Sequence, residues 1–109
     1  MTVISIRKDM NGRIAGFKVK GHSEYADPGE DIVCAALSAI THSAAYGLEC
    51  HLKRQLKLKV DKKKGELALE LVAEADELSE AILMTMVIGL QQIANEYPKY
   101  VIMNTVEVK

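Results

Sequence analysis

The sequence predicts an α+β fold in which an antiparallel or mixed sheet carries two helices on one face, in the order ββαββαβ. Two observations predict this class. Apolar and polar residues alternate in two pairs of short segments and in a last segment near the C-terminus, and two longer segments have the period of a helix. Two helices are too few for a parallel βαβ series, in which every crossover needs its own connection. We therefore expect both helices to pack on the same face of one sheet.

Five segments alternate as half-buried strands do. Ile4 and Ile6 alternate with other residues in the first segment, and Ala15, Phe17 and Val19 do so in the second. An Asn-Gly pair lies between these two segments, and this pair is typical of tight hairpin turns. A Lys-Lys-Lys-Gly stretch separates the third and fourth segments. The predicted strands are residues 2–8, 15–20, 56–61, 67–71 and 100–108.

Two segments have helical periodicity. The first runs from Ile32 to about His51, with Asp31 placed to cap its N-terminus. The second starts at Asp76 or Ser79 and runs to about residue 96, where a proline stops it. In the first helix the apolar stripe consists of Val33, Leu37, Ile40, Ala44, Gly47 and Leu48, whereas Cys34, Ser38, Thr41 and His42 lie off it.

Length and composition exclude several classes of protein. The 109 residues predict a single domain spanning residues 1–109. Apolar residues make up 49% and charged residues 27%, so intrinsic disorder is excluded. The 14 basic and 15 acidic residues balance, so the overall charge does not favour a nucleic acid. Apolar stretches fall short of the roughly 20 residues that cross a bilayer, and no leader precedes the first strand. We therefore expect a cytoplasmic protein without membrane contact.

The second predicted helix carries more apolar surface than one stripe requires. This excess either contacts a second copy in a homodimer or is buried within its own domain. The two neighbouring stripes are Leu78, Ile82, Met86 and Ile93, and Leu83, Val87, Leu90 and Ala94.

Cys34 is the residue that most invites a chemical interpretation. The only other cysteine is Cys50, and two are too few for a disulfide framework. In the first turn of a helix, Cys34 lies at the positive end of the helix dipole, which favours the thiolate. His22 precedes it by twelve positions in a loop that returns to this helix, so the imidazole and the thiol can meet. The spacing alone also permits an inert, buried cysteine.

A Cys-His pair performs acyl transfer, with the imidazole as general base and the thiolate as nucleophile. Backbone N–H groups at the helix start, including that of Cys34, are candidates for binding the oxyanion. Asp31 either caps the helix or orients His22; as a cap, its charge disfavours the thiolate. Ser38, one turn after Cys34, either hydrogen-bonds into the site or keeps this face small for the substrate.

Other groups carry weaker signals. The histidines and cysteines lack a metal-binding spacing, so we expect no metal and no cofactor. Seven basic residues fall between positions 53 and 64 without an aromatic residue to stack on a base, which favours a solvated surface over an RNA contact. Tyr25, in the loop, either lines a substrate groove or holds the loop shut.

Two stretches resemble the signature of the ribosomal-processing cysteine protease (Prp) family of Firmicutes and related bacteria. They are Gly-His-Ser-Glu-Tyr-Ala at residues 21–26 and Gly-Glu-Asp-Ile-Val-Cys-Ala-Ala-Leu-Ser at residues 29–38. Further segments resemble the family at residues 47–49, 88–90, 97–98 and 100–101, so the resemblance covers nearly the whole chain.

This resemblance implies a small homodimeric α+β endopeptidase. Its substrate would be the precursor of the large-subunit ribosomal protein numbered twenty-seven, from which it removes a short N-terminal extension. Cys34 matches the family nucleophile and His22 the general base, while Gly21, Asp31 and Ser38 match positions that the family keeps around this dyad.

The resemblance also implies that the loop ahead of the cysteine moves to admit the substrate. Tyr25 and Gly29 lie in this loop, Gly21 and Gly29 are candidate hinges, and Pro28 would stiffen it. The alternative function is a non-catalytic binding module associated with the ribosome or with RNA, which the basic residues between positions 53 and 64 would serve.

Overall fold

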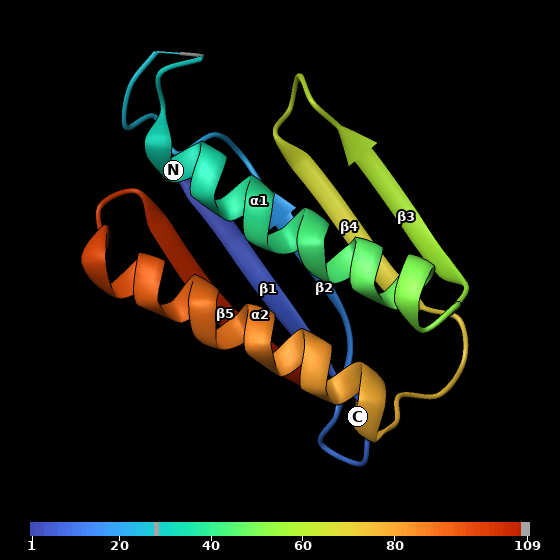
Figure 1. Ribbon diagram of the computed structural model, residues 1–109. Helices are drawn as coiled ribbons and strands as arrows, with labels where there is room; N and C mark the ends of the chain where they lie inside the picture. The colour runs from blue at the N-terminus through green and yellow to red at the C-terminus, as the bar shows by residue number, and fades with distance from the viewer. Residues whose placement is uncertain (28, 108–109) are drawn as a thin grey trace.

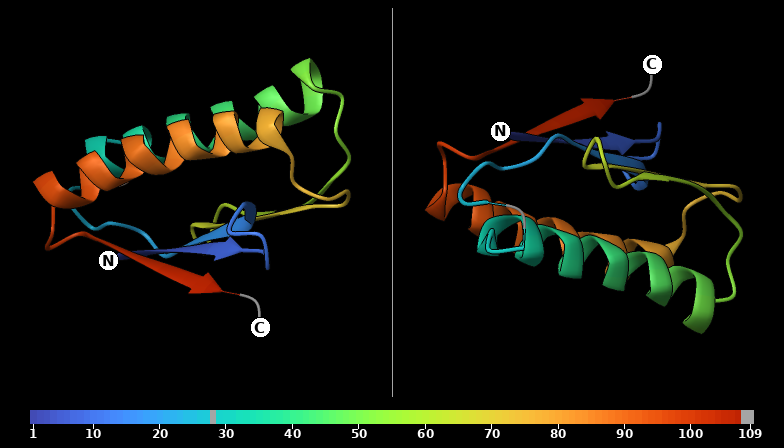
Figure 2. Two further views of the ribbon diagram at one scale, coloured as in Figure 1. Left: turned by 90° about the horizontal axis from the view of Figure 1, so that it is seen from below. Right: turned by 90° about the horizontal axis from the view of Figure 1, so that it is seen from above.

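The predicted α+β class and the order ββαββαβ are confirmed. The computed structural model describes residues 1–27 and 29–107, so Pro28 and Val108, the predicted end of the last strand, lie outside the described residues. Figure 1 shows two helices side by side over one sheet, and Figure 2 shows both on the same face of it. The elements are β1 (Thr2–Lys8), β2 (Ile14–Lys20), α1 (Ile32–Tyr46), the π-helical turn η1 (Gly47–His51), β3 (Leu56–Asp61), β4 (Glu66–Leu71), α2 (Glu77–Glu96) and β5 (Val101–Glu107).

The five strands form one mixed sheet in the order β3-β4-β2-β1-β5. The two hairpins, β1-β2 and β3-β4, are antiparallel, and β2 also pairs antiparallel with β4. β5 pairs parallel with β1, beginning at Thr2 opposite Val101, because the chain crosses over the sheet through α2 before it returns. Both hairpins therefore lie in one sheet, with the β3-β4 tip beside the loop that precedes α1 (Figure 1).

The core lies between the sheet and the helices. Ile4 of β1 and Leu69 of β4 are fully buried, as are Leu83 and Leu90 of α2. Each of these side chains contributes roughly 1.5–3 kcal/mol by leaving water. The inward side chains of β1 and β4 follow the alternation that the sequence predicts.

One strand departs from the predicted alternation. The sequence indicated that Ala15 would share the inward face with Phe17, but Ile14 is fully buried and Ala15 only partly so. The reason is a register shift, in which Arg7 pairs with Gly16 and Lys8 with Ile14, so that Ala15 is an extra residue. A β-bulge of this kind reverses the inward and outward positions on one side of it.

Helix α1 also differs in one position from the predicted stripe. Thr41, which the periodicity placed off the stripe, is 2% exposed. Its hydroxyl donates a hydrogen bond to the carbonyl of Leu37 at 2.8 Å, so its polar atom is satisfied within the helix and it can be buried. The α-helix ends at Tyr46, and the π-helical turn η1 replaces the last turn that the sequence predicts.

The helical segment Ile32–His51 has 20 residues and a mean hydropathy of 1.2, which by length and composition is enough to cross a membrane. The expectation that apolar stretches fall short of this length therefore fails by this measure. One such helix is weak evidence for a membrane segment, because a helix in the core of a globular protein passes the same test. Here the segment lies along the sheet, with Val33 and Leu37 of α1 and Leu48 of η1 buried.

Much of the apolar excess of α2 is buried within this chain. Leu83, Met86 and Leu90 are at most 2% exposed, so most of one predicted stripe faces the core together with part of the other. Leu78 and Ile88, in contrast, are 59% and 56% exposed. Burial within the domain therefore accounts for part of the excess, and the homodimer stays a prediction.

Candidate active site

The start of α1 is built around the Asp31 carboxylate. Asp31 has an extended backbone and caps the helix, and its Oδ1 accepts the N–H of Cys34 at 2.9 Å. Its Oδ2 accepts the N–H of Tyr25 at 3.0 Å and that of Ala26 at 3.5 Å. The same side chain therefore caps the helix and ties down the loop that leads to it.

These contacts decide how Asp31 acts. Partial burial alone would raise its pKa, but the hydrogen bonds from Cys34, Tyr25 and Ala26 outweigh burial and hold the pKa of Asp31 below its ordinary value. Its contacts are those of a cap, and among the described residues no hydrogen bond joins Asp31 to His22. The N–H of Cys34, expected from sequence to bind an oxyanion, is already engaged by Asp31 in this structure.

The loop that carries His22 is attached to the first strand. Gly21 has a φ of +90°, and a Cβ there would lie 2.7 Å from the carbonyl oxygen of Met1, so only glycine fits this close approach. The Met1 amine donates to the carbonyl of His22 at 2.8 Å, and Thr2 Oγ1 donates to the carbonyl of Gly21 at 3.1 Å. Residues 21 and 22 are therefore positioned by the start of β1.

The thiol of Cys34 faces this anchored loop. Its Sγ accepts the N–H of Ser23 at 3.3 Å, and the buried Ser23 hydroxyl lies 2.9 Å from Thr2 Oγ1. Cys34 is half-buried and, like the exposed Cys50, is not in a disulfide. The thiol is thus accessible, and polar groups hold its surroundings in place.

His22 and Cys34 line the same cavity, which has a volume of about 450 Å³. The exposed His22 imidazole is held by Nε2, which donates to the carbonyl oxygen of Lys63 at 2.8 Å. No hydrogen bond joins His22 to Cys34 within residues 1–27 and 29–107. The walls of the cavity are both polar and apolar and include Gly21, Leu37, Ser38, His42, Tyr46, Val60, Glu66 and Leu67.

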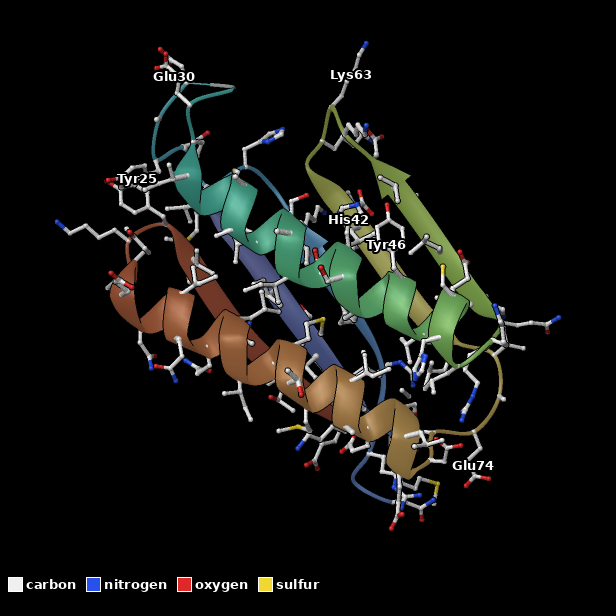
Figure 3. All side chains as sticks on the ribbon, viewed as in Figure 1. Tyr25, Glu30, His42, Tyr46, Lys63 and Glu74 are labelled. Atoms are coloured by element: carbon white, nitrogen blue, oxygen red, sulfur yellow. The ribbon has the colours of Figure 1, made fainter. Side chains whose placement is uncertain are left out.

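Ser38 and His42 extend the site along α1. Cys34, Ser38 and His42 are spaced four residues apart, which places them on one face of the helix. His42 Nδ1 donates to the carbonyl of Ser38 at 2.8 Å and lies 3.2 Å from Ser38 Oγ. Figure 3 shows His42 and Tyr46 pointing from α1 toward the β3-β4 hairpin. We assigned no site role to His42 from sequence, although its spacing from Cys34 was the available signal.

The two predicted loop residues have different surroundings. The ring of Tyr25 packs edge-on against Tyr97 at 5.6 Å and Tyr100 at 5.3 Å, near the ends of α2 and β5 (Figure 3). Gly29 has a φ of +91° and lines a second cavity, of about 790 Å³, that also reaches His22 and Cys34. Of the two roles considered for Tyr25, its contacts fit holding the loop better than lining a groove.

The basic residues between positions 53 and 64 do not form one free surface. Arg54 pairs with Asp76 at 2.7 Å, and Lys59 lies 3.8 Å from Glu66. Lys63 is at the tip of the β3-β4 hairpin, with its side chain pointing away from the sheet (Figure 3). Among the described residues, no three His, Cys, Asp or Glu side chains are grouped so that they could hold a metal ion.

This chain is similar in sequence to proteins of known activity. Residues 1–102 match the model of a family described as cysteine protease Prp. The ribosomal processing cysteine protease Prp of Staphylococcus aureus is 25% identical over 104 residues, covering 95% of this chain and 98% of the relative. The protein of the same name from Mycoplasma genitalium is 31% identical over 85 residues, covering 78% and 82%.

Two solved structures have the same fold. The essential ribosomal processing protease Prp from S. aureus, with a covalently linked product peptide, aligns with a TM-score of 0.90 at 25% identity, over 96% of this chain and 99% of that chain. The same protease with a substrate peptide aligns with a TM-score of 0.85 at 24% identity, over 96% and 99%. The second likeness bears on the fold alone.

Proposed function

This chain belongs to the cysteine protease Prp family, and we propose that Cys34 is its nucleophile, that His22 is its general base, and that it processes a ribosomal protein precursor. As a member of this family, the chain is a cysteine protease. The observation that most directly supports the dyad is that the Cys34 thiol, in the first turn of α1, lines the same cavity as the His22 imidazole. A non-catalytic binding module does not agree with this membership.

The proposed reaction has two steps. In the first, the Cys34 thiol gives its proton to His22, the sulfur bonds to the scissile carbonyl carbon, and the imidazolium protonates the amine nitrogen as the C–N bond breaks. In the second, water loses a proton to His22 and attacks the thioester, and the sulfur leaves and recovers its proton. The covalently linked product peptide of the S. aureus relative supports an intermediate bonded to the enzyme.

We propose that the substrate is the large-subunit ribosomal protein numbered twenty-seven and that its N-terminal extension is removed. Both curated relatives are named for ribosomal processing, and the resemblance of residues 21–38 to the family signature supports the same class of substrate. The resemblance to the family implies cleavage beside apolar residues. Leu37, Val60 and Leu67 line the cavity with Cys34 and offer an apolar wall for such a residue.

Asp31, Gly21 and Ser38 have supporting roles in this proposal. Asp31 holds the loop against the helix start, and Gly21 permits the close approach to Met1. Ser38 lines the cavity one turn beyond the nucleophile. Because Asp31 engages the N–H of Cys34, that group can bind an oxyanion only after the carboxylate shifts, which fits a loop that moves when substrate binds.

We also propose that the protein acts in the cytoplasm as a single-domain homodimer. Ribosomal processing supports the location, and the exposed Leu78 and Ile88 of α2 supply apolar surface for a partner. Sedimentation should show a dimer at micromolar concentration, and a monomer under these conditions would contradict the assembly.

The dyad is tested by cleavage of the extended ribosomal protein with the parent protein and its variants. Cys34→Ala should reduce the rate on the order of a thousandfold or more without changing the thermal midpoint, and His22→Ala should also reduce it strongly. Cys50→Ala is the matched control and should cleave at the parent rate, since Cys50 is exposed and lines neither cavity described at the site.

Processing at the parent rate by Cys34→Ala would contradict the nucleophile assignment. An alkylating agent gives an independent measure, because an activated Cys34 should be labelled faster than Cys50. If a short peptide were cleaved and the ribosomal precursor were not, the substrate proposal would fail and the dyad would stand.

A further inference from the structure

The imidazole of His22 has a partner that the proposed dyad does not include. Its Nε2 lies 2.8 Å from the carbonyl oxygen of Lys63, at the tip of the β3-β4 hairpin. A carbonyl has no proton to give, so in this hydrogen bond Nε2 carries the hydrogen. In the neutral ring the lone pair is then on Nδ1, and Nδ1 is the atom that can take a proton.

A third group commonly holds the imidazole of a catalytic pair in one tautomer and one orientation. Asp31 was the candidate for this task from sequence. Its two oxygens accept hydrogen bonds from the backbone of Cys34, Tyr25 and Ala26 instead. The Lys63 carbonyl is therefore the group whose contact fits the orienting task.

The hairpin tip comes close to His22 because glycine stands at position 65. Gly65 has a φ of +61°, and a Cβ there would lie 3.0 Å from the carbonyl carbon and oxygen of Gly21 and 3.1 Å from Cε1 of His22. Within the turn, the Gly65 N–H donates to the carbonyl of Lys62 at 3.2 Å. The Lys64 N–H also donates to Asp61 Oδ1 at 3.2 Å, so the turn is formed by contacts within the hairpin. The lack of a side chain at position 65 lets the turn contact residues 21 and 22.

We propose that the β3-β4 hairpin tip positions the catalytic base: the backbone carbonyl of Lys63 accepts Nε2–H of His22, selects this tautomer and leaves Nδ1 to exchange the proton with Cys34. This inference rests on the proposed His22-Cys34 dyad. When Nδ1 takes the thiol proton, the ring becomes positive and its bond to the carbonyl becomes a stronger, charge-assisted one. Nδ1 then gives the proton to the leaving amine, and Nε2 keeps its own throughout.

The tautomer is measured directly in the unaltered protein. Nitrogen-15 NMR at about pH 8, where an ordinary histidine is neutral, should show His22 as the Nε2–H form alone. The spectrum of His22→Ala identifies its signals among those of the three histidines. An Nδ1–H form, or a mixture of the two forms, would overturn the proposal.

A pair of glycine variants tests the effect on the reaction. Gly65→Ala places a methyl group against His22 and Gly21, whereas Gly12→Ala, at a φ of +80° in the β1-β2 turn, meets nothing within 4 Å. Both variants strain a left-handed backbone and should lower the thermal midpoint, Gly65→Ala by more because its methyl group also crowds Gly21 and His22. Only Gly65→Ala should lower kcat, by about tenfold or more, with a smaller change in KM and slower alkylation of Cys34 in a Cys50→Ser background.

The outcomes separate this inference from the proposed function. If His22→Ala cleaves and is alkylated like the parent, the dyad itself fails. If His22→Ala is inactive while Gly65→Ala and Gly12→Ala have equal kcat, only the role of the hairpin fails. If Gly65→Ala does not fold, the NMR measurement on the parent protein decides by itself.

Discussion

Helices α1 and α2 both begin at an aspartate whose Oδ1 accepts the N–H of the residue three positions later. Asp31 accepts from Cys34 at 2.9 Å, and Asp76 accepts from Ser79 at 3.0 Å. In α2 the buried Ser79 side chain turns back and accepts the N–H of Asp76 at 3.0 Å, which completes a capping box. In α1 the equivalent side chain is the Cys34 thiol, which faces the loop and a cavity. The same kind of cap therefore completes a capping box at α2 and leaves the proposed nucleophile, Cys34, facing a cavity at α1.

The second carboxylate oxygen extends this difference. Asp76 Oδ2 accepts a hydrogen bond from Arg54 at 2.7 Å, which joins α2 to the segment before β3. Asp31 Oδ2 accepts backbone N–H groups of the loop that carries the site. Loss of the first cap should therefore affect stability alone, and loss of the second should affect both stability and activity.

The largest expected effect distinguishes the two aspartates. Asp31→Ala should destabilise the protein by about 1 kcal/mol, as loss of an N-cap does, and lower kcat/KM by about tenfold because the loop loses its anchor. Asp76→Ala should lower stability and leave kcat/KM at the parent value. Urea unfolding and peptide cleavage measure the two quantities. If Asp31→Ala had the activity of the parent, the two caps would not differ in their effect on function.

A moderate effect is expected from acid. Arg54, followed by the Ser79 N–H, lowers the pKa of Asp76 from 3.8 to about 2, and hydrogen bonds lower that of Asp31. The unfolded chain then binds protons more readily than the folded one, so the stabilisation is complete above pH 3.8 and is lost as the pH falls toward about 2. Urea unfolding from about pH 5 to pH 2 should show this loss, and Asp76→Asn should reduce it. If the free energy of unfolding of Asp76→Asn fell with pH as steeply as that of the parent, Asp76 would not be the source of this loss.

The smallest effect is expected at the loop itself. Tyr25→Ala removes the edge-on contacts with Tyr97 and Tyr100, worth about 1 kcal/mol beyond burial. It keeps the Tyr25 N–H bond to Asp31, so the loop should become more sensitive to limited proteolysis while kcat changes little. Tyr25→Phe retains the ring and is the control. Equal proteolysis of Tyr25→Ala and the parent would show that the aromatic contact does not hold the loop.

Local patterns predicted most of the fold and failed where distant contacts intervened. The strands, both helices and the Asp31 cap followed from alternation, period and capping residues. The start of the second helix was open between Asp76 and Ser79, and the structure has Asp76 as the cap. Ala15 was misplaced because a bulge depends on the pairing of β2 with β1, which alternation within β2 does not report. Val60 alternates as a half-buried residue does, yet it is 45% exposed because it lies on an edge strand.

The amino-acid sequence by itself determined the elements, the motif that identifies the family, and the position of Cys34 in the first turn of a capped helix, because these depend on neighbours a few residues away. Only the tertiary structure decided what surrounds the thiol and the imidazole. It placed Asp31 on the loop backbone, His42 on the cavity wall and the Lys63 carbonyl on His22. Every residue has a carbonyl, so no sequence pattern distinguishes the one at Lys63; the packing of the β3-β4 turn against residues 21 and 22 brings it to the site.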